Sequence, residues 1–156
     1  MPDVDERPGI AYQRSRHGME GMRALHRAAA DGGLAPRLVE LVRVRVSQVN
    51  RCQYCIDLHS GNALAAGETP RRLFALAAWP DSPLFCARER AALALADALT
   101  GLGRGGVPQP VLQDCRERFP ADALVALLYA IVEVNAWNRL AIAARKPLPD
   151  QPGSRG

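Results

Sequence analysis

Apolar residues recur at helical spacing along most of the chain. Leu38, Leu41, Val42, Val46 and Val49 form one such stripe, with the three- and four-residue steps of an amphipathic helix. Proline at first helical positions and glycine after last ones mark the ends of several such segments. The pattern predicts helices over residues 15–30, 36–49, 52–66, 69–79, 87–100, 108–118 and 121–144.

One segment is ambiguous, because Val42 to Val46 reads Val-Arg-Val-Arg-Val and alternates with the period of a strand. Pro36 and the flanking helical spacing favour a helix there as well. The expected fold is therefore all-α: one compact domain of about six or seven helices covering residues 1–156. Its core is expected over about 15–146, with flexible tails at 1–9 and 147–156.

The composition favours helices and argues against one class of function, nucleic-acid binding. Alanine and leucine dominate, while valine, isoleucine, threonine and aromatic residues are sparse. The nineteen arginines and one lysine are interleaved with acids, and the net charge is only +4. A nucleic-acid-binding protein would more often gather such residues into a basic patch with stacking aromatics, so no nucleic-acid partner is expected.

No targeting or membrane segment is expected. The N-terminus, MPDVDERPGIAYQRSRHG, lacks an apolar core of the kind that secretory signals have. The longest apolar run, ALVALLYAIV at 123–132, ends at Glu133 and is far shorter than the roughly 20 residues that span a bilayer. It predicts a buried core helix in a cytoplasmic protein. Because residues 91–96 and 123–132 are apolar on more than one face, a homo-oligomer is expected.

The chemically distinctive stretch is NRCQYCIDLH, residues 50–59. On a helix, Cys55 lies about 60° and His59 about 20° around the axis from Cys52, so all three share one face. In the cytoplasm a Cys-x-x-Cys pair is typical of catalytic, redox or metal-binding sites rather than of structural disulfides. The first turn of a helix is expected to lower thiol pKa values, and His59 can act as a base.

Glu40 is the fourth candidate. It lies among apolar residues of the preceding helix, and a turn at 48–51 would fold that helix back and bring Glu40 to the cysteines. Burial there is expected to raise its pKa, giving a carboxyl group that exchanges a proton with His59. Two alternatives remain open: Glu40 as a solvated surface charge, and Cys52, Cys55, His59 and Glu40 as metal ligands.

The other candidates have plainer interpretations. Surface, core or purely structural roles are expected for His17, His26, Trp79, Trp137, Cys86, Cys115, Asn138 and Arg139.

The spacing of Glu40, eleven residues, Cys52, two residues, Cys55, three residues and His59 resembles the pattern of the alkyl hydroperoxidase D-like branch of the carboxymuconolactone decarboxylase superfamily. The resemblance extends from about residue 15 to 149. It implies an all-helical protein that assembles as a homo-trimer or homo-hexamer and needs no cofactor. It also implies that Cys55 is the peroxidatic thiol, that Cys52 resolves it as a disulfide, and that Glu40 and His59 relay the proton.

The leading hypothesis is thus a thiol-dependent peroxidase that reduces hydrogen peroxide or small organic hydroperoxides, with an unidentified dithiol as reductant. The helix dipole alone would favour Cys52 as the attacking thiol, but the four-residue step to His59 favours Cys55. Gln53 and Tyr54 are the two residues between the cysteines, where some peroxidase members of the family carry a histidine. A disulfide carrier with little peroxidase turnover, and a metal-binding structural protein, are the alternatives.

Overall fold

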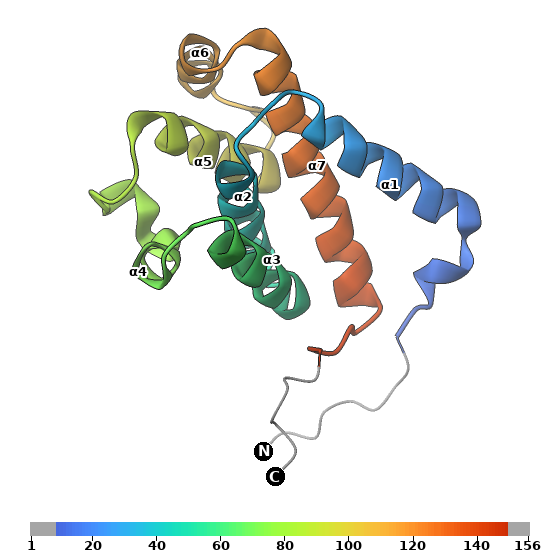
Figure 1. The fold of residues 1–156 in the computed structure, drawn as a ribbon. Helices are drawn as coiled ribbons and strands as arrows, with labels where there is room; N and C mark the ends of the chain where they lie inside the picture. Colours follow the sequence, from blue (N-terminus) through green and yellow to red (C-terminus); the bar gives the residue numbers. More distant parts are fainter. Residues whose placement is uncertain (1–8, 150–156) are drawn as a thin grey trace.

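The computed structural model describes residues 9–149, and within that range all regular secondary structure is helical (Figure 1). The predicted tails lie largely outside these residues, at 1–8 and 150–156. The all-α fold class is confirmed, and the predicted helices agree with the observed ones to within a few residues. The elements are η1 (Tyr12–Arg14), α1 (Arg16–Ala30), α2 (Pro36–Val49), α3 (Gln53–Ala65), α4 (Pro70–Ala75), η2 (Leu76–Asp81), α5 (Ala87–Thr100), α6 (Gln109–Arg118) and α7 (Ala121–Ala143).

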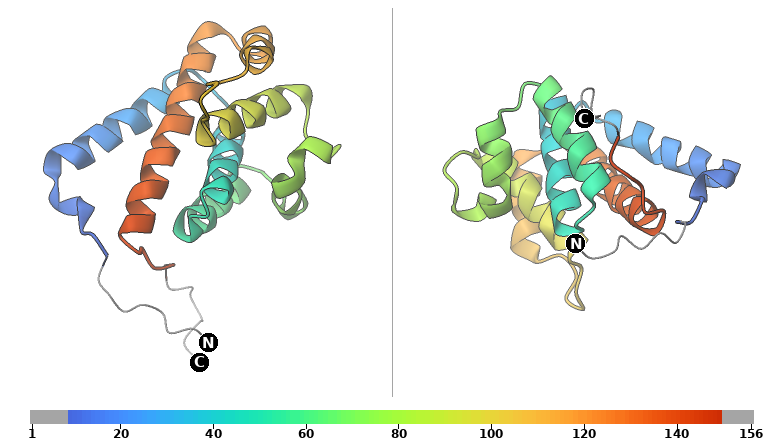
Figure 2. Two further views of the ribbon diagram at one scale, coloured as in Figure 1. Left: turned by 180° about the vertical axis from the view of Figure 1, so that it is seen from behind. Right: turned by 90° about the horizontal axis from the view of Figure 1, so that it is seen from below.

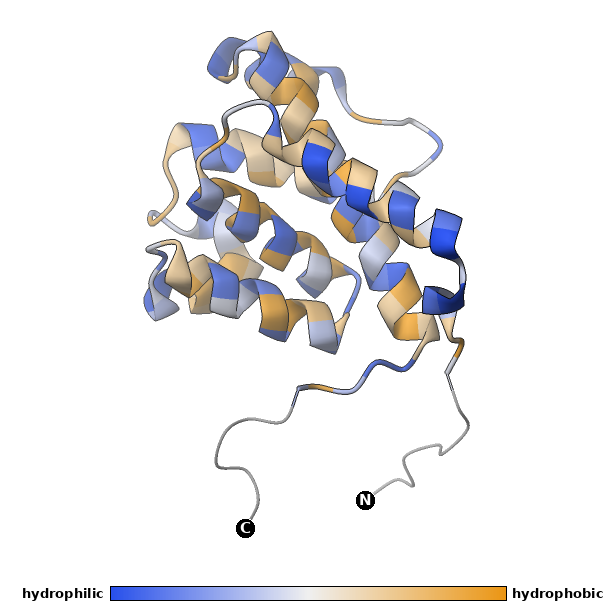
Figure 3. Cartoon of the chain, turned by 45° about the vertical axis from the view of Figure 1, so that its right-hand side comes forward, coloured by the Kyte–Doolittle hydropathy of each residue, from blue (hydrophilic) through white to orange (hydrophobic). Residues whose placement is uncertain are grey.

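Helix α2 is the centre of the fold. It begins with Pro36 at a first helical position and packs against α3, α5 and α7, which surround it in Figures 1 and 2. Leu41, Val42 and Val46 are fully buried. Helix α1 instead packs mainly on α7 and buries little beyond Ala29, and in Figure 3 hydrophilic residues alternate along it with apolar ones. A cavity lies between α2, α3 and α7.

The burial of α2 on several sides explains why valine and arginine alternate along residues 42–46, as they would in a strand. Arg45 points to α5, where its Nε and Nη2 donate to the two carboxylate oxygens of Asp97 at 2.6 and 2.9 Å. Arg43 points to α7 and pairs there with Glu133. Each guanidinium finds a carboxylate on a neighbouring helix, so arginines can alternate with buried valines without leaving a buried charge unpaired.

Helix α7 is long and apolar enough to span a bilayer by length and composition alone, and 44% of an apolar 18-residue stretch within it is buried inside the domain. Its fully buried Leu127 and Ile131 belong to one core cluster with Val42 and Val46 of α2, as expected of a core helix. Another side of α7 leaves large apolar side chains exposed. These exposed residues are Val125, Leu128, Tyr129, Val132 and Ile142. The homo-oligomer expected from the sequence stays a prediction.

A tight turn reverses the chain between α2 and α3. Arg51 adopts a left-handed conformation, with φ of 58°, and the N–H of Cys52 donates to the carbonyl of Ser47 at 3.0 Å. Asn138 of α7, fully buried, accepts from the Asn50 side chain at 2.8 Å and donates to the Ser47 hydroxyl at 3.1 Å. These bonds fix the turn that was expected at 48–51 and place Cys52 at the N-cap of α3.

Candidate active site

The two cysteines begin α3. Cys52 is the N-cap and Cys55 lies in the first turn. Their sulfur atoms are 2.6 Å apart, both are free thiols, and the residues are only 2% and 3% exposed. A disulfide joins sulfurs at about 2.05 Å, so the pair can be oxidised with little movement of the backbone. Of the two, Cys55 lines an adjoining cavity and Cys52 lies behind it.

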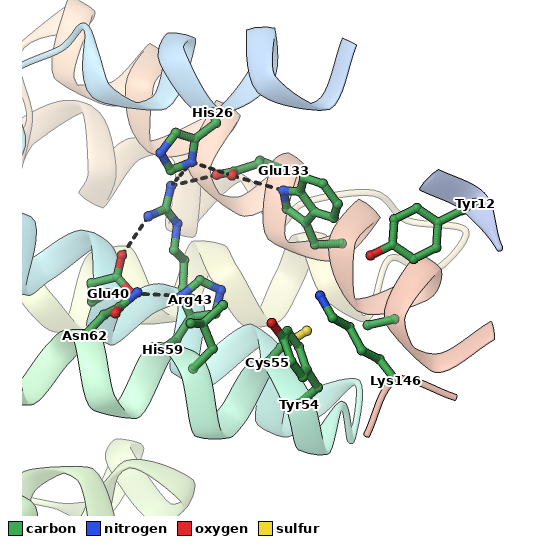
Figure 4. Close-up of a pocket in the computed structure, with 13 residues that line it drawn as sticks. Tyr12, His26, Glu40, Arg43, Tyr54, Cys55, His59, Asn62, Glu133 and Lys146 are labelled. Carbon is green, nitrogen blue, oxygen red and sulfur yellow. Dashed lines mark hydrogen bonds and ion pairs between the residues drawn. The ribbon is translucent and has the colours of Figure 1, made fainter. Parts of the chain in front are cut away.

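That cavity has a volume of about 470 Å³ and lies between α2, α3 and α7, with Tyr12 and Lys146 at one end (Figure 4). Apolar and aromatic side chains form part of its wall. Among them are Tyr54 and Leu58 of α3 and Trp137 of α7. The charged and titratable groups that line it, besides Cys55 and the two tyrosines Tyr12 and Tyr54, are His26, Glu40, Arg43, His59, Glu133 and Lys146.

Glu40 and His59 form a buried acid–base pair. The Nδ1 atom of His59 lies 2.8 Å from Oε2 of Glu40, and each side chain is 11% exposed. A carboxylate at this distance assigns a proton to Nδ1, which donates to Glu40. Nε2 then carries the lone pair, and no side chain within residues 9–149 hydrogen-bonds to it. The turn between α2 and α3 therefore brings two of the predicted residues into contact.

Arg43 extends this pair into a larger network. Its Nη1 donates to Glu40 at 2.7 Å and its Nη2 to Glu133 at 2.6 Å. Glu133 also lies 2.7 Å from Nδ1 of His26 and accepts from the Trp137 indole at 3.2 Å. Two carboxylate–imidazole pairs thus share one guanidinium (Figure 4). Because arginine does not give up its proton, Arg43 holds both carboxylates in place but does not pass protons between them.

This network reverses the direction expected for the pKa of Glu40. Burial raises the pKa of a carboxyl group, but here the hydrogen bond from His59 and the charges of His59 and Arg43 outweigh burial. The pKa of Glu40 is lowered, and the prediction of a raised value is wrong. Glu40 is an ionised carboxylate that orients His59, rather than a neutral acid.

The thiol of Cys55 also differs from expectation. Burial, followed by the hydrogen bond with Cys52, raises the pKa of Cys55 to about 12, while a hydrogen bond from Asn138 and the charge of Lys146 act in the opposite direction. The predicted lowering at a helix N-terminus is therefore wrong for Cys55, because desolvation outweighs a dipole effect of about 0.3–1 kcal/mol. His59 and Cys55 both line the cavity, but no hydrogen bond joins them, since His59 turns to Glu40.

Lys146 is the cation nearest the end of the cavity opposite this network (Figure 4). It follows α7, where its N–H donates to the carbonyl of Ala141 at 3.0 Å. Its ammonium lies 3.9 Å from the centre of the Tyr54 ring. Burial would lower the pKa of Lys146, but its interaction with the Tyr54 hydroxyl and the charges of Tyr12, Tyr54 and Cys55 outweigh burial and raise it. Lys146 is a cation at neutral pH.

Sequence reasoning missed Arg43, Glu133, Tyr54 and Lys146, whereas His26 is exposed as expected and in addition pairs with Glu133 at the cavity. A signal was present for three of them. Arg43 and Glu133 are charges inside strongly apolar helical stretches, and Lys146 is the only lysine among twenty basic residues. A charged residue on a buried helical face requires a partner, although the sequence does not say which residue that partner is.

The remaining candidates lie outside the cavity. Cys115 is fully buried, its thiol donates to the carbonyl of Ala91, and burial and the charge of Asp114 raise its pKa to about 11. Cys86 is exposed at the N-cap of α5, and Arg139 bonds to Asn135 one turn earlier. Within residues 9–149 no three His, Cys, Asp or Glu side chains are arranged to hold a metal ion.

Comparison with known proteins identifies the family. Residues 17–98 match the carboxymuconolactone decarboxylase family. The uncharacterized protein YdfG of Bacillus subtilis (strain 168) is 33% identical over 132 residues, which cover 85% of this chain and 90% of YdfG. The chain belongs to the carboxymuconolactone decarboxylase family. The predicted family relationship is thereby confirmed.

Solved structures of similar proteins share the fold of this family member. One is a protein of unknown function from Agrobacterium tumefaciens, provisionally assigned to antioxidant defence as AhpD. It is 28% identical, has a TM-score of 0.85, and the match covers 93% of this chain and all of that one. An uncharacterized peroxidase-related protein from Silicibacter sp. TM1040 is 21% identical with a TM-score of 0.72, over 86% and 72% of the two chains. The predicted alkyl hydroperoxidase D-like fold is confirmed.

Proposed function

We propose that the protein is a thiol-dependent peroxidase that reduces hydroperoxides through a dithiol–disulfide cycle of Cys52 and Cys55. One observation carries the proposal: two free thiols within bonding reach, one of them lining a cavity that also holds a carboxylate-oriented imidazole. The likeness to a provisional antioxidant defence protein supports the same class of reaction.

The reaction starts at the Cys55 sulfur. Its thiolate attacks the outer oxygen of the hydroperoxide, the O–O bond breaks, and the alkoxide leaves as an alcohol after taking up a proton. Cys55 is then a sulfenic acid. The Cys52 sulfur displaces the hydroxyl group as water and forms the disulfide. One hydroperoxide and two thiols thus give one alcohol, one water and one disulfide, and an external dithiol restores the thiols.

His59 supplies the base that this step needs. With a pKa raised to about 12, the Cys55 thiol is almost entirely protonated at neutral pH. A neutral His59 with its lone pair on Nε2 can accept the thiol proton through a water molecule or through the bound hydroperoxide. Glu40 stabilises the imidazolium that forms, as a carboxylate does behind a catalytic histidine.

A disulfide carrier with little peroxidase turnover is the second candidate, and the raised pKa of Cys55 favours it. A thiol that resists ionisation attacks peroxide slowly unless a base acts at the same moment. The raised pKa also means that the reduced dithiol is not stabilised as a thiolate, and it is this stabilisation that makes some Cys-x-x-Cys pairs oxidising. Such a pair donates electrons readily to other disulfides.

One assay separates these candidates. Turnover of hydrogen peroxide and of cumene hydroperoxide is measured with dithiothreitol or dihydrolipoamide as reductant, for the wild type, Cys55→Ser and Cys86→Ser. A peroxidase is expected to turn over repeatedly, to lose this turnover in Cys55→Ser and to keep it in Cys86→Ser, which removes an exposed cysteine outside the cavity. Rapid exchange with protein disulfides combined with no more than one slow turnover of peroxide would favour the carrier.

A further inference from the structure

The cavity is much larger than hydrogen peroxide requires. Its volume of about 470 Å³ falls within the range of about 300–1,000 Å³ that is usual for small-molecule sites, whereas a molecule the size of water occupies about 30 Å³. Several of its walls are apolar, including Leu58 and the rings of Tyr54 and Trp137. Tyr12 packs edge-on against Trp137, with ring centres 6.2 Å apart. The cavity can therefore enclose an apolar organic body.

The charges at the two ends of this cavity are balanced differently. At the end near α1, the carboxylates of Glu40 and Glu133 are bound to Arg43, and each also faces a histidine. At the opposite end Lys146 has no carboxylate within ion-pair distance among residues 9–149. Its ammonium rests over the Tyr54 ring, and aromatic rings form its surroundings (Figure 4).

An ammonium held partly out of water, with no carboxylate partner among residues 9–149, favours the binding of an anion. Cys55 lies between the two ends, next to Tyr54 in Figure 4. A ligand that extends from Lys146 along the aromatic wall would bring its other end to the thiol. The two carboxylates at the far end disfavour a second anionic group there, so one end of the ligand is anionic and the other is neutral.

We propose that this cavity selects molecules that join an apolar body to a carboxylate, and that Lys146 binds the carboxylate. This inference rests on the proposed function for its chemical consequence: the substrate is then an organic hydroperoxide that carries a carboxylate, with its peroxide group at Cys55. Lys146 is the residue that determines this specificity. Hydrogen peroxide and uncharged hydroperoxides offer no carboxylate for Lys146 to bind.

Binding is tested without the redox reaction, by isothermal titration calorimetry of the reduced protein. The probes are 4-isopropylbenzoate and the uncharged cumyl alcohol, which share an apolar body. The variants are Lys146→Met, Lys146→Arg and Arg104→Met; the last removes one exposed positive charge from the loop between α5 and α6. We expect the wild type, Lys146→Arg and Arg104→Met to bind the benzoate, and Lys146→Met to bind it about 10- to 100-fold more weakly, with no change for the alcohol.

Equal affinity of the wild type for both probes, or unchanged benzoate binding by Lys146→Met, would overturn the inference. Turnover gives a separate answer. The ratio of kcat/KM for 4-(2-hydroperoxypropan-2-yl)benzoate to that for cumene hydroperoxide should fall about tenfold or more in Lys146→Met. If benzoate binds through Lys146 but neither hydroperoxide is turned over, the anion site stands and the peroxidase proposal fails. If both hydroperoxides are turned over and the ratio of their kcat/KM values does not depend on Lys146, the peroxidase proposal stands and the carboxylate specificity fails.

Discussion

The Glu40→Gln substitution tests the acid–base pair with little change in shape. Glu40 accepts from His59 Nδ1 at 2.8 Å through one oxygen and from Arg43 at 2.7 Å through the other. A glutamine amide can present an N–H to Nδ1 instead. It then favours the histidine tautomer with the proton on Nε2, and the lone pair that accepts the Cys55 proton is lost.

The expected loss follows from the geometry. Two unit charges about 4 Å apart attract by about 4 kcal/mol at an effective dielectric constant of about 20, a value suited to side chains that are each 11% exposed. The amide dipole and nearby groups retain part of this stabilisation of the imidazolium. We therefore expect kcat/KM for hydroperoxide to fall by about 100- to 1,000-fold, a change of roughly 3–4 kcal/mol.

Glu133→Gln is the matched control. It removes the other carboxylate bound to Arg43, at 2.6 Å and in a residue only 3% exposed, but leaves the Glu40–His59 pair intact. Turnover with a dithiol reductant is measured for both variants, with thermal unfolding to show that each is folded. In Glu133→Gln, kcat/KM for hydroperoxide should fall by no more than about tenfold. Equal losses in the two folded variants would refute the reasoning, because Glu40 would then act only through the charge balance around Arg43.

Four further results are expected. In Gly32→Ala the new methyl group would lie 2.5 Å from the carbonyl oxygen of Asp122, so urea unfolding should show a loss of about 1–3 kcal/mol; an unchanged midpoint would contradict the close approach of the turn after α1 to α7. Alkylation of Cys55 by iodoacetamide should still accelerate above pH 10, since its pKa is about 12, and a plateau below pH 9 would exclude that value. The same raised pKa adds stability that is fully present below about pH 9, the unfolded value, and is lost as pH rises through about 12. Cys86→Ser places a better hydrogen-bond acceptor at the N-cap of α5 and should stabilise the fold by about 0.5–1 kcal/mol in urea unfolding, whereas destabilisation would show that the sulfur packs better than the hydroxyl.

The helices could be predicted because their signals are local. Pro36 and Pro70 open α2 and α4, Gly67 follows α3, and the apolar spacing between such markers gives the period. The turn before Cys52 was also predictable from the need to return Glu40 to the cysteines. Its fixation by Asn138 was not, because that residue lies 91 positions from Ser47 in sequence and only packing of α7 on α2 brings it there.

The electrostatics of the site depend on such packing throughout. The Glu40 pKa was predicted in the wrong direction because local reasoning included burial but not Arg43. The Cys55 pKa was predicted in the wrong direction because the helix N-terminus is a local feature, whereas burial under α7 is a property of the whole fold. Lys146 reaches the cavity only because α7 ends beside α3. Sequence spacing can therefore propose reactive residues, but the charges that tune them come from other helices.

The central claim is that hydroperoxide oxidises Cys55 first and Cys52 then resolves it, and trapping the intermediate tests this most directly. Cys52→Ser and Cys55→Ser are each treated with one equivalent of cumene hydroperoxide in the presence of dimedone, and peptides are identified by mass spectrometry. We expect a dimedone adduct on Cys55 in Cys52→Ser, little adduct on Cys52 in Cys55→Ser, and a Cys52–Cys55 disulfide in the wild type. A dimedone adduct on Cys52 in Cys55→Ser, with Cys55 unmodified in Cys52→Ser, would contradict this claim.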